Sequence, residues 1–358
     1  MVSDNSEQIE KPPSSRGFLI IGLGLLLLVA FVLSLSLGSV RIPFGDIVSV
    51  LFGGEGTRPA WTTIVYTIRL PKALTAVLAG AALSVSGLQM QTLFRNPLAD
   101  PFVLGINAGA SLGVAIVVLA FGSVGSALLA GLGVLGDLSL AFAASLGAAV
   151  VLGSVLLISR KVQSVMTLLI LGLMFGYATG AFVSVLLYFS IPEQIQAFII
   201  WTFGSFGGVT WRQMVVLAPA IALGLIFAFL MVKPLNALLL GENYARSMGV
   251  PVQRVRIWTL SGASILAGVT TAFCGPIAFL GLAVPHLCRS LLNTSDHRLL
   301  MPAVTLLGAT IALLADLIAR LPGSQATLPL NAVTSLVGAP VVIWVILRRQ
   351  NLNAAFAD

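Results

Sequence analysis

The chain is dominated by long apolar runs that are separated by short clusters of charged residues, glycine and proline. Each run holds about 20 residues, which is enough for a helix to cross the hydrocarbon core of a bilayer. Of the 358 residues, 58% are hydrophobic and only 9% are charged, whereas an average soluble domain has roughly 25% charged residues. The sequence therefore predicts an all-α polytopic membrane protein whose solvent is lipid.

We expect about ten transmembrane helices from the number of these runs. Glycine or proline in three of the runs predicts that their helices are broken or tilted, namely 102–121, 277–293 and 299–320. The first run is longer than the core of a signal peptide and is interpreted as a retained span. The ten predicted spans are 18–37, 73–92, 102–121, 139–158, 164–190, 213–232, 255–274, 277–293, 299–320 and 328–347.

Outside the spans, residues 1–16 are polar and are predicted to form a disordered cytoplasmic tail, which leaves 17–358 as the transmembrane domain. The net charge of +7 is better explained by topology than by nucleic acid, because short loops rich in Lys and Arg stay in the cytoplasm. Both termini are therefore predicted to be cytoplasmic. If the spans alternate, the inner cations are Lys11, Arg16, Arg95, Arg160, Lys161, Lys233, Arg246, Arg254, Arg256, Arg298, Arg348 and Arg349. The outer cations are Arg41, Arg58, Arg69, Lys72, Arg212 and Arg320.

The sequence offers no complete catalytic set. It lacks the G-x-x-x-x-G-K-[ST] pattern of a phosphate-binding loop, so any nucleotide hydrolysis is expected in another chain. His286 and Cys288 invite a metal or catalytic interpretation, but no second ligand stands at a suitable spacing. We interpret His286 as a structural hydrogen-bonding group, and Cys274 and Cys288 as small buried hydrophobes. An intramembrane enzyme would need an acid, a base and a nucleophile, so we expect neither enzyme activity, nor a cofactor, nor a metal site.

The segment 95–105 is predicted to be a stiff break between two spans, because Pro97 and Pro101 cannot both lie inside one straight helix. Asp100 is expected to cap the following helix, with Pro101 in its first turn. The break is either a tight turn or a constriction that lines a pathway. In the preceding span, residues 79–87 are mostly small, which predicts close packing between helices in lipid. Lining of the pathway is the alternative role for this segment.

The segment 239–250 separates two apolar runs on the predicted cytoplasmic side. Gly241 opens it, and Gly249 is expected to adopt the left-handed conformation that ends a helix. A featureless polar loop is the alternative to a short helix here. Side chains typical of protein interfaces favour a docking knob; they are Glu242, Tyr244, Arg246 and Met248.

Charged residues are almost absent from the predicted spans. Asp316 and Arg320 stand four residues apart near the outer end of one span, where they can pair with each other. Ionisable groups within spans usually mark ion relays or substrate paths. Their scarcity argues against a proton- or sodium-coupled carrier and favours a pathway that is driven from outside the membrane.

At these segments the sequence resembles the permease family of type II ABC importers, which serves iron-siderophores, haem and vitamin B12. The resemblance covers essentially the whole chain after the tail, with several motifs in the same order. The matching segments are RNPLADPFVLGINAGASLG (95–113), LLLGENYARSMGV (238–250), GPIAFLGLAVPHLCR (275–289), DHRLLMPAVTLLGATIALLADLIAR (296–320) and LPLNAVTSLVGAPVVIWVIL (328–347).

The resemblance implies the type II ABC importer permease fold, in the inner (plasma) membrane. It implies four kinds of partner: two ABC ATPase subunits, a periplasmic or lipid-anchored substrate-binding protein, a second permease subunit and the lipid bilayer. The second permease could be identical or a sister chain, and no nucleic acid is involved. The implied function is the ATP-driven import of an iron chelate, with a ferric siderophore expected and haem or vitamin B12 as alternatives. An ion-coupled secondary transporter is the alternative from another class.

The resemblance also implies roles for individual residues. Asn96 and Leu98 match the inner gate, and Val165 and Met166 match a second inner gate, where relatives often carry small polar residues. The residues that match the ATPase coupling helix are Leu240, Gly241, Glu242, Tyr244, Ala245, Arg246, Met248 and Gly249.

Arg69 and Arg320 match outer-face arginines that pair with acidic residues of the binding protein. An exposed arginine can steer an acidic partner by charge complementarity. Arg320 could instead pair with Asp316, and Arg69 could reach the membrane interface beside Lys72. Both alternatives stay open at the level of the sequence.

Overall fold

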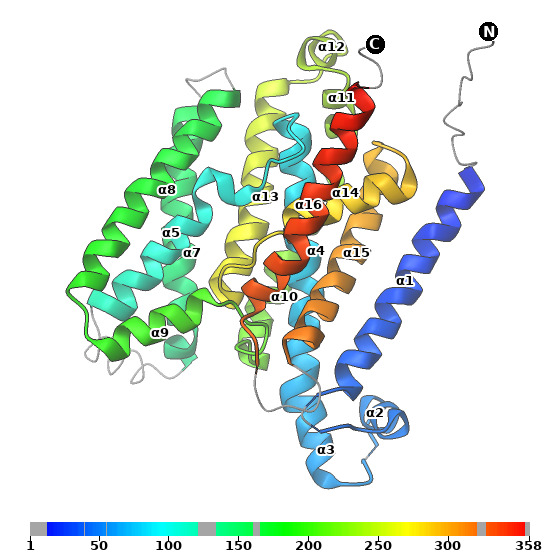
Figure 1. Cartoon of the computed structure of the whole chain (residues 1–358), viewed down its shortest axis with the longest axis vertical. Helices are drawn as coiled ribbons and strands as arrows, with labels where there is room; N and C mark the ends of the chain where they lie inside the picture. The colour runs from blue at the N-terminus through cyan, green and yellow to red at the C-terminus, as the bar shows by residue number, and fades with distance from the viewer. Residues whose placement is uncertain are drawn as a thin grey trace.

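The computed structural model describes residues 13–38, 40–54, 56–120, 134–159, 165–320 and 327–354, and it describes most of their side chains. Within these ranges the chain forms helices and no β-strand (Figure 1). The prediction of an all-α fold is confirmed. The longer helices are α1 (Pro13–Ser36), α4 (Leu70–Leu93), α7 (Val134–Ser159), α8 (Val165–Tyr188), α10 (Trp211–Leu230), α13 (Val252–Cys274), α15 (His297–Ala319) and α16 (Leu330–Ala354).

Shorter elements connect or interrupt the long helices. In the described part of the chain, seven helices are long and apolar enough to cross a membrane, and three apolar helices are shorter, at 10–17 residues. Together they correspond to the ten predicted spans. The short elements are α2 (Phe44–Leu51), α3 (Pro59–Thr63), η1 (Ile64–Arg69), η2 (Pro101–Leu104), α5 (Ile106–Ala115), η3 (Ile116–Ala120), α9 (Pro192–Thr202), α11 (Val232–Leu239), α12 (Glu242–Ser247) and α14 (Leu280–Leu292).

The two ends of the molecule differ in what they carry. The α12 end also holds the start of α1 and the end of α16, whereas α2 and α3 lie at the opposite end, which we name the α2 end (Figure 1). Helix α1 begins at Pro13, so residues 13–16 are helical although they were predicted to belong to a disordered tail. The fixed φ of proline suits the first turn of a helix, which explains the earlier start. Residues 1–12 lie outside the described ranges.

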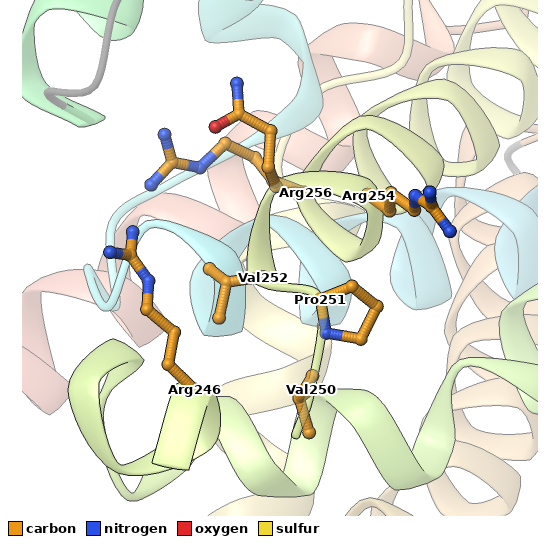
Figure 2. Close-up of a pocket in the computed structure, with 7 residues that line it drawn as sticks. Arg246, Val250, Pro251, Val252, Arg254 and Arg256 are labelled. Atoms are coloured by element: carbon orange, nitrogen blue, oxygen red, sulfur yellow. The ribbon is translucent and has the colours of Figure 1, made fainter. Parts of the chain in front are cut away.

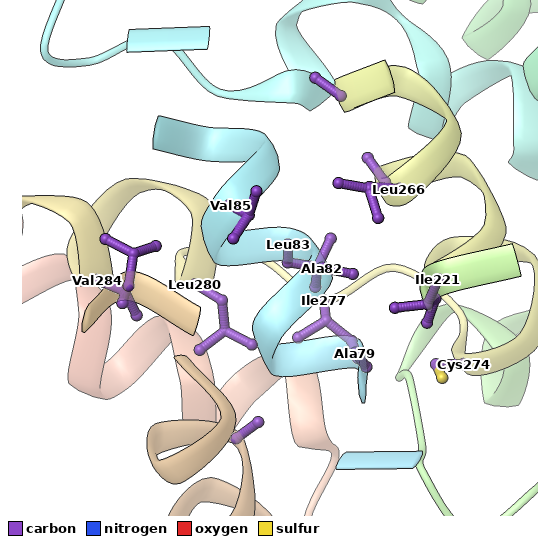
Figure 3. Close-up of a cluster of buried hydrophobic side chains, with 14 of the residues drawn as sticks. Ala79, Ala82, Leu83, Val85, Ile221, Leu266, Cys274, Ile277, Leu280 and Val284 are labelled. Atoms are coloured by element: carbon purple, nitrogen blue, oxygen red, sulfur yellow. The ribbon is translucent and has the colours of Figure 1, made fainter. Parts of the chain in front are cut away.

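Helix α4 is the centre of the fold. Every residue from 79 to 94 is buried, and the helix contacts α10, α13, α14 and α15. Figure 3 shows side chains of α4, among them Ala79, Leu83 and Val85, surrounded by apolar side chains from neighbouring segments, such as Leu266 and Val284. A helix that is covered on all sides cannot face lipid, so α4 is the core about which the others are arranged.

Small residues let α4 touch its neighbours backbone to backbone. A Cβ atom placed on Gly80 would overlap the carbonyl oxygen of Gly308 in α15, and one placed on Gly87 would overlap the backbone of Gly281 in α14. The bulk of even one methyl group is therefore excluded at both contacts. The predicted role of the small residues in helix packing is confirmed.

Two of the three predicted breaks are present. The span 102–121 is divided into η2, α5 and η3, with Gly105 at φ 78° between the first two. In the span 277–293 the helix begins only at Leu280, because residues 275–278 form no regular secondary structure. There the N–H of Ala278 donates to Asn331 Oδ1 (3.1 Å), so protein groups satisfy the irregular backbone as a membrane interior requires.

The third run, 299–320, was predicted to be broken or tilted, and it is not broken, because α15 continues through Pro302. Proline removes one backbone donor, and the helix accommodates this single loss near its start. Gly308 serves packing rather than bending, since Ser84 of α4 occupies the space that a side chain would need.

Candidate translocation and coupling sites

The predicted docking knob is a short helix, α12, at one end of the molecule. Gly241 (φ 108°) and Gly249 (φ 82°) bound it, and the left-handed backbone of Gly249 confirms the predicted helix end. Three apolar side chains at four-residue spacing project from this segment. Leu240 is 64% exposed, Tyr244 54% and Met248 48%, so this stripe is free to contact another protein.

The opposite face of α12 is anchored to the body of the protein. Ala245, which the resemblance placed among the coupling residues, is fully buried. Glu242 pairs with Arg256 of α13 at 2.6 Å and lies 3.7 Å from Arg246 on its own helix. These contacts attach α12 to the start of α13.

A basic hollow lies between α12 and the start of α13 (Figure 2). Its volume is about 430 Å³. Glu242 is the acidic partner of two of its arginines, which leaves an excess of positive charge at this end of the molecule. Its lining residues are Arg246, Val250, Pro251, Val252, Gln253, Arg254 and Arg256.

The loop after α4 contains the residues matched to the first inner gate. Arg95 adopts a left-handed φ of 45°, which turns the chain sharply out of the helix. Asn96 Oδ1 then accepts the N–H of Leu98 (2.9 Å), and the Leu98 side chain is 45% exposed. Asp100 caps η2 by accepting the N–H of Phe102 (2.8 Å). The predicted break and cap are both confirmed, and we name residues 95–98 the gate loop.

His286 of α14 holds the gate loop in place. Its Nε2 lies 2.7 Å from the carbonyl oxygen of Pro97. A carbonyl only accepts, so this nitrogen must carry the hydrogen. The interpretation of His286 as a structural hydrogen-bonding group is confirmed. Cys274 and Cys288 are free and buried, as predicted. Within the described residues, no three His, Cys, Asp or Glu side chains come together as metal ligands would.

The residues matched to a second inner gate, Val165 and Met166, are the first two residues of α8. Their side chains lie outside the described part of the structure, so their gating role stays a prediction.

Arg69 does not project from the outer face. It is only 5% exposed, and its guanidinium donates to the carbonyl oxygens of Leu35 (2.6 Å), Ser36 (2.9 Å) and Val40. These carbonyls belong to the end of α1 and the segment that follows it. Arg69 therefore fastens the α1–α2 connection to η1, a contact between distant segments that no local pattern predicts.

Arg320 pairs with Asp316, as one of the two alternatives predicted. Its guanidinium also donates to the carbonyl oxygen of Ser34 (3.1 Å). Lys72 of α4 reaches the same carboxylate, with 2.9 Å between Nζ and Oδ1. Arg69, Lys72, Asp316 and Arg320 thus gather at the α2 end. We name them the outer charge cluster, in which Lys72 and Arg320 share the carboxylate of Asp316 while Arg69 is bound by backbone carbonyls.

A polar network at the α12 end was missed by the sequence interpretation. Asn236 of α11 contacts both Asp296 and His297 at the start of α15, and His297 reaches Thr92 in the last turn of α4. Burial acts to raise the pKa of Asp296, but the N–H of Arg298 and the Asn236 amide outweigh it and lower that pKa below its usual value. The only signal in the sequence was the polar triplet DHR at the start of a span.

Comparison with known proteins agrees with this architecture. The model of the FecCD transport family matches residues 26–348. The vitamin B12 import system permease protein BtuC of Klebsiella pneumoniae is 39% identical over 334 residues, which cover 92% of this chain and 94% of that protein. The protein of the same name from Shigella boydii is 37% identical over 331 residues, with the same coverage.

A solved structure shares the fold along nearly its whole length. It is an inward-facing conformation of an ABC transporter assigned to the metal-chelate type. It aligns with a TM-score of 0.80 and 29% identity, over 93% of this chain and 99% of the other. Family model, sequence relatives and fold thus agree. The chain belongs to the FecCD transport family and is a permease of an ABC importer.

Proposed function

We propose that this chain forms half of the membrane pathway of an importer for a bulky metal-bearing ligand. It would work as a dimer with an identical or sister permease, above two ATPase subunits and below a substrate-binding protein. The permease itself performs no chemistry. ATP binding and hydrolysis in the partners would move α12, tilt the helices and open the two ends of the pathway in turn.

The observation that carries this proposal is the exposed face of α12. Leu240, Tyr244 and Met248 form an apolar stripe that is exposed in the part of the chain that the structure describes, and aromatic and Met side chains are enriched at protein interfaces. Beside it lies the basic hollow of Arg246, Arg254 and Arg256, which would receive acidic side chains of the ATPase. An apolar anchor with a charged rim is the usual arrangement of a specific interface.

In this scheme the α12 end of the protein faces the cytoplasm, and both termini of the chain are cytoplasmic. The start of α1 and the end of α16 lie at that same end (Figure 1), which supports the orientation. Asn96 and Leu98 would then form the inner gate, and Val165 and Met166 at the start of α8 would form a second inner gate.

The outer charge cluster would take part in docking of the substrate-binding protein. The guanidinium groups of Arg69 and Arg320 are bound by backbone carbonyls and by Asp316. The binding protein would therefore respond to the excess positive potential of the cluster, rather than pairing with two free arginines.

The names of the sequence relatives support one class of cargo. The sequence relatives are named as vitamin B12 permeases, and the expected ferric siderophore finds no such support. We therefore propose vitamin B12 or a similar corrinoid, which is a bulky cobalt chelate. A ferric chelate is the second candidate, because the solved neighbour is assigned to the metal-chelate type.

The decisive experiment removes two side chains from α12. Tyr244→Ala combined with Arg246→Ala should abolish co-purification of the ATPase and lower ATP-driven uptake at least tenfold in proteoliposomes. Uptake is measured separately with radiolabelled cyanocobalamin, a ferric hydroxamate siderophore and haemin. The matched control is Tyr188→Ala combined with Arg212→Ala, since both residues are exposed and neither belongs to the α12 segment.

Two results would contradict the proposal. Normal ATPase assembly and uptake in the α12 double variant would remove the docking role. Uptake by the isolated chain in a proton gradient, with no ATPase present, would replace the importer with a secondary transporter.

A further inference from the structure

Three elements meet at a buried polar contact close to α12. Asn236 lies on α11, which leads through Leu240 directly into α12. His297 is the first residue of α15, and Thr92 lies in the last turn of α4. We propose that Asn236, His297 and Thr92 form a relay that transmits movement of α12 to the gate loop. This inference rests on the proposed function, because it assigns a mechanical role to residues between the ATPase contact and the gate.

The contact between α11 and α15 has a defined orientation. Asn236 Nδ2 lies 2.6 Å from Asp296 Oδ1, and a carboxylate only accepts, so the amide nitrogen faces Asp296. The amide oxygen consequently faces His297. It accepts the backbone N–H of that residue (2.9 Å) and lies 2.7 Å from ring atom Nδ1. Asn236 therefore grips the start of α15 through three hydrogen bonds.

The second contact joins α15 to α4. With Nδ1 donating to Asn236, the neutral ring of His297 offers Nε2 as an acceptor, 2.8 Å from Thr92 Oγ1. The single hydroxyl hydrogen of Thr92 is shared between this nitrogen and the carbonyl oxygen of Leu88, which lies 2.9 Å from Oγ1. Both side chains are buried. A hydrogen bond in this environment is strong and directional, and loss of one partner leaves the other unsatisfied. The imidazole ring thus bridges Asn236 of α11 and Thr92 of α4.

Thr92 is directly bound to the gate loop. Its carbonyl oxygen accepts the N–H of Arg95 (3.2 Å), and the carbonyl oxygen of Gln91 accepts the N–H of Asn96 (3.2 Å). On its far side the loop is fixed by the contact between Pro97 and His286. A displacement of Thr92 therefore moves Arg95 and Asn96 about a fixed point at Pro97, which is what opening a gate requires.

Helix capping alone does not explain this arrangement. Asp296 caps α15 by accepting the N–H of Arg298 (2.9 Å), and that bond needs neither Asn236 nor Thr92. Both residues belong to other elements, and their contacts hold those elements to His297. The relay is thus a connection between helices, and its residues position the gate rather than touch the cargo.

The test uses the complete complex in proteoliposomes, with its ATPase and binding protein. Asn236→Leu and Thr92→Val remove the polar atoms at nearly constant volume. Each is compared with Thr75→Val, a matched control on α4, because the Thr75 hydroxyl donates within its own helix to Pro71 (2.8 Å). The measured quantity is the number of cargo molecules imported per ATP hydrolysed. The cargo probe is whichever of radiolabelled cyanocobalamin and a ferric hydroxamate siderophore the wild-type complex imports.

We expect both relay variants to assemble and to hydrolyse ATP within about twofold of the control, while import per ATP falls at least fivefold. A fivefold fall corresponds to about 1 kcal/mol, since tenfold corresponds to about 1.4 kcal/mol. The variant that combines Asn236→Leu with Thr92→Val should be no worse than either alone, because members of one chain of contacts are not additive. Thr92→Ser keeps the hydroxyl and should restore coupling.

A second readout follows the gate itself. Leu98→Cys introduces an exposed thiol on the gate loop, whereas the native Cys274 and Cys288 are buried. Maleimide labelling of Leu98→Cys should change with nucleotide in the control background and should lose that dependence in both relay variants.

Several outcomes would overturn the relay. These are import per ATP equal to the Thr75→Val control, a parallel fall of assembly, ATPase activity and import in Asn236→Leu, or a Thr92→Ser variant as defective as Thr92→Val. If Thr92→Val fails to assemble, Asn236→Leu on the partly exposed α11 decides alone. A wild-type complex without ATP-driven import would instead refute the proposed function, and so the two failures are distinguishable.

Discussion

Asp100 is a buried carboxylate at the junction of the gate loop and η2, outside the membrane-spanning helices. Its burial raises the pKa from 3.8 to about 6, although the N–H of Phe102 acts to lower it. The native state therefore holds this proton more tightly than the unfolded chain does. The contribution of Asp100 to the free energy of unfolding is therefore greatest below pH 4, near the pKa of this carboxyl group in the unfolded chain. This contribution is lost as the pH rises through 6.

This residue predicts a pH-dependent stability. Between pH 4 and pH 6.5 the free energy of unfolding attributable to Asp100 should fall by an amount on the order of 3 kcal/mol, which corresponds to its shift in pKa. Asp100→Asn should abolish that part of the slope, because the neutral amide keeps the cap to Phe102 without a charge. Thermal unfolding in detergent at a series of pH values measures the effect.

Asp296→Asn provides the comparison, since the pKa of Asp296 is lowered rather than raised. That carboxylate stabilises the fold above pH 4 and loses its contribution only in stronger acid. If Asp100→Asn keeps the wild-type dependence of the free energy of unfolding on pH, the prediction is contradicted.

Several individual residues could be predicted because their roles are local. Asp100 precedes a proline, and Gly249 ends a short helix, so the sequence itself contains both partners of each interaction. Arg69, Asn236 and His297 could not be predicted. Their partners are carbonyls or side chains from helices far away in the chain, and only the packed structure brings them together.

At the scale of helices, the contact between α4 and α14 is set by glycine. Alanine normally favours a helix over glycine by about 1 kcal/mol. At Gly87 this preference is reversed, because the added Cβ would overlap the backbone of Gly281, which cannot rotate away. The two helices would have to separate, and the gate loop that follows α4 would move with them.

We therefore expect Gly87→Ala to lower the melting temperature of the purified protein by several degrees and to reduce uptake. Gly153→Ala on α7 is the matched control, since nothing lies within 4 Å of the position that its Cβ would take, and it should be neutral or slightly stabilising. Equal melting temperatures for the two variants would show that α4 and α14 can separate at Gly87 without loss of stability.

The helices themselves were largely predictable because lipid demands long apolar segments, and each of the ten runs has a counterpart in the structure. The breaks were harder. Proline and glycine mark places where a helix can break, but Pro302 is accommodated in α15 while residues 275–278 form no regular secondary structure. The difference depends on partners such as Asn331, which supply hydrogen bonds to an unwound backbone.

At the scale of the whole molecule, the proposed orientation can be tested with single thiols. Gly208→Cys lies in an exposed loop that precedes α10, and Ser295→Cys lies between α14 and α15. A membrane-impermeant maleimide should label the first in intact spheroplasts and the second only after permeabilisation. The reverse pattern would place α12 outside the cell and would be incompatible with an ATPase partner there.

Helices α4 and α15 run side by side from the relay to the outer charge cluster, and Gly80 and Gly308 hold them in direct contact. A tilt of this pair at Thr92 and His297 is therefore also a displacement of Lys72 and Asp316. If nucleotide changes the affinity of an extracytoplasmic protein through this pair, thermodynamic linkage requires the converse by the same factor. Binding of the extracytoplasmic protein would then change the affinity of the ATPase subunits for nucleotide inside the cell, before any cargo has crossed.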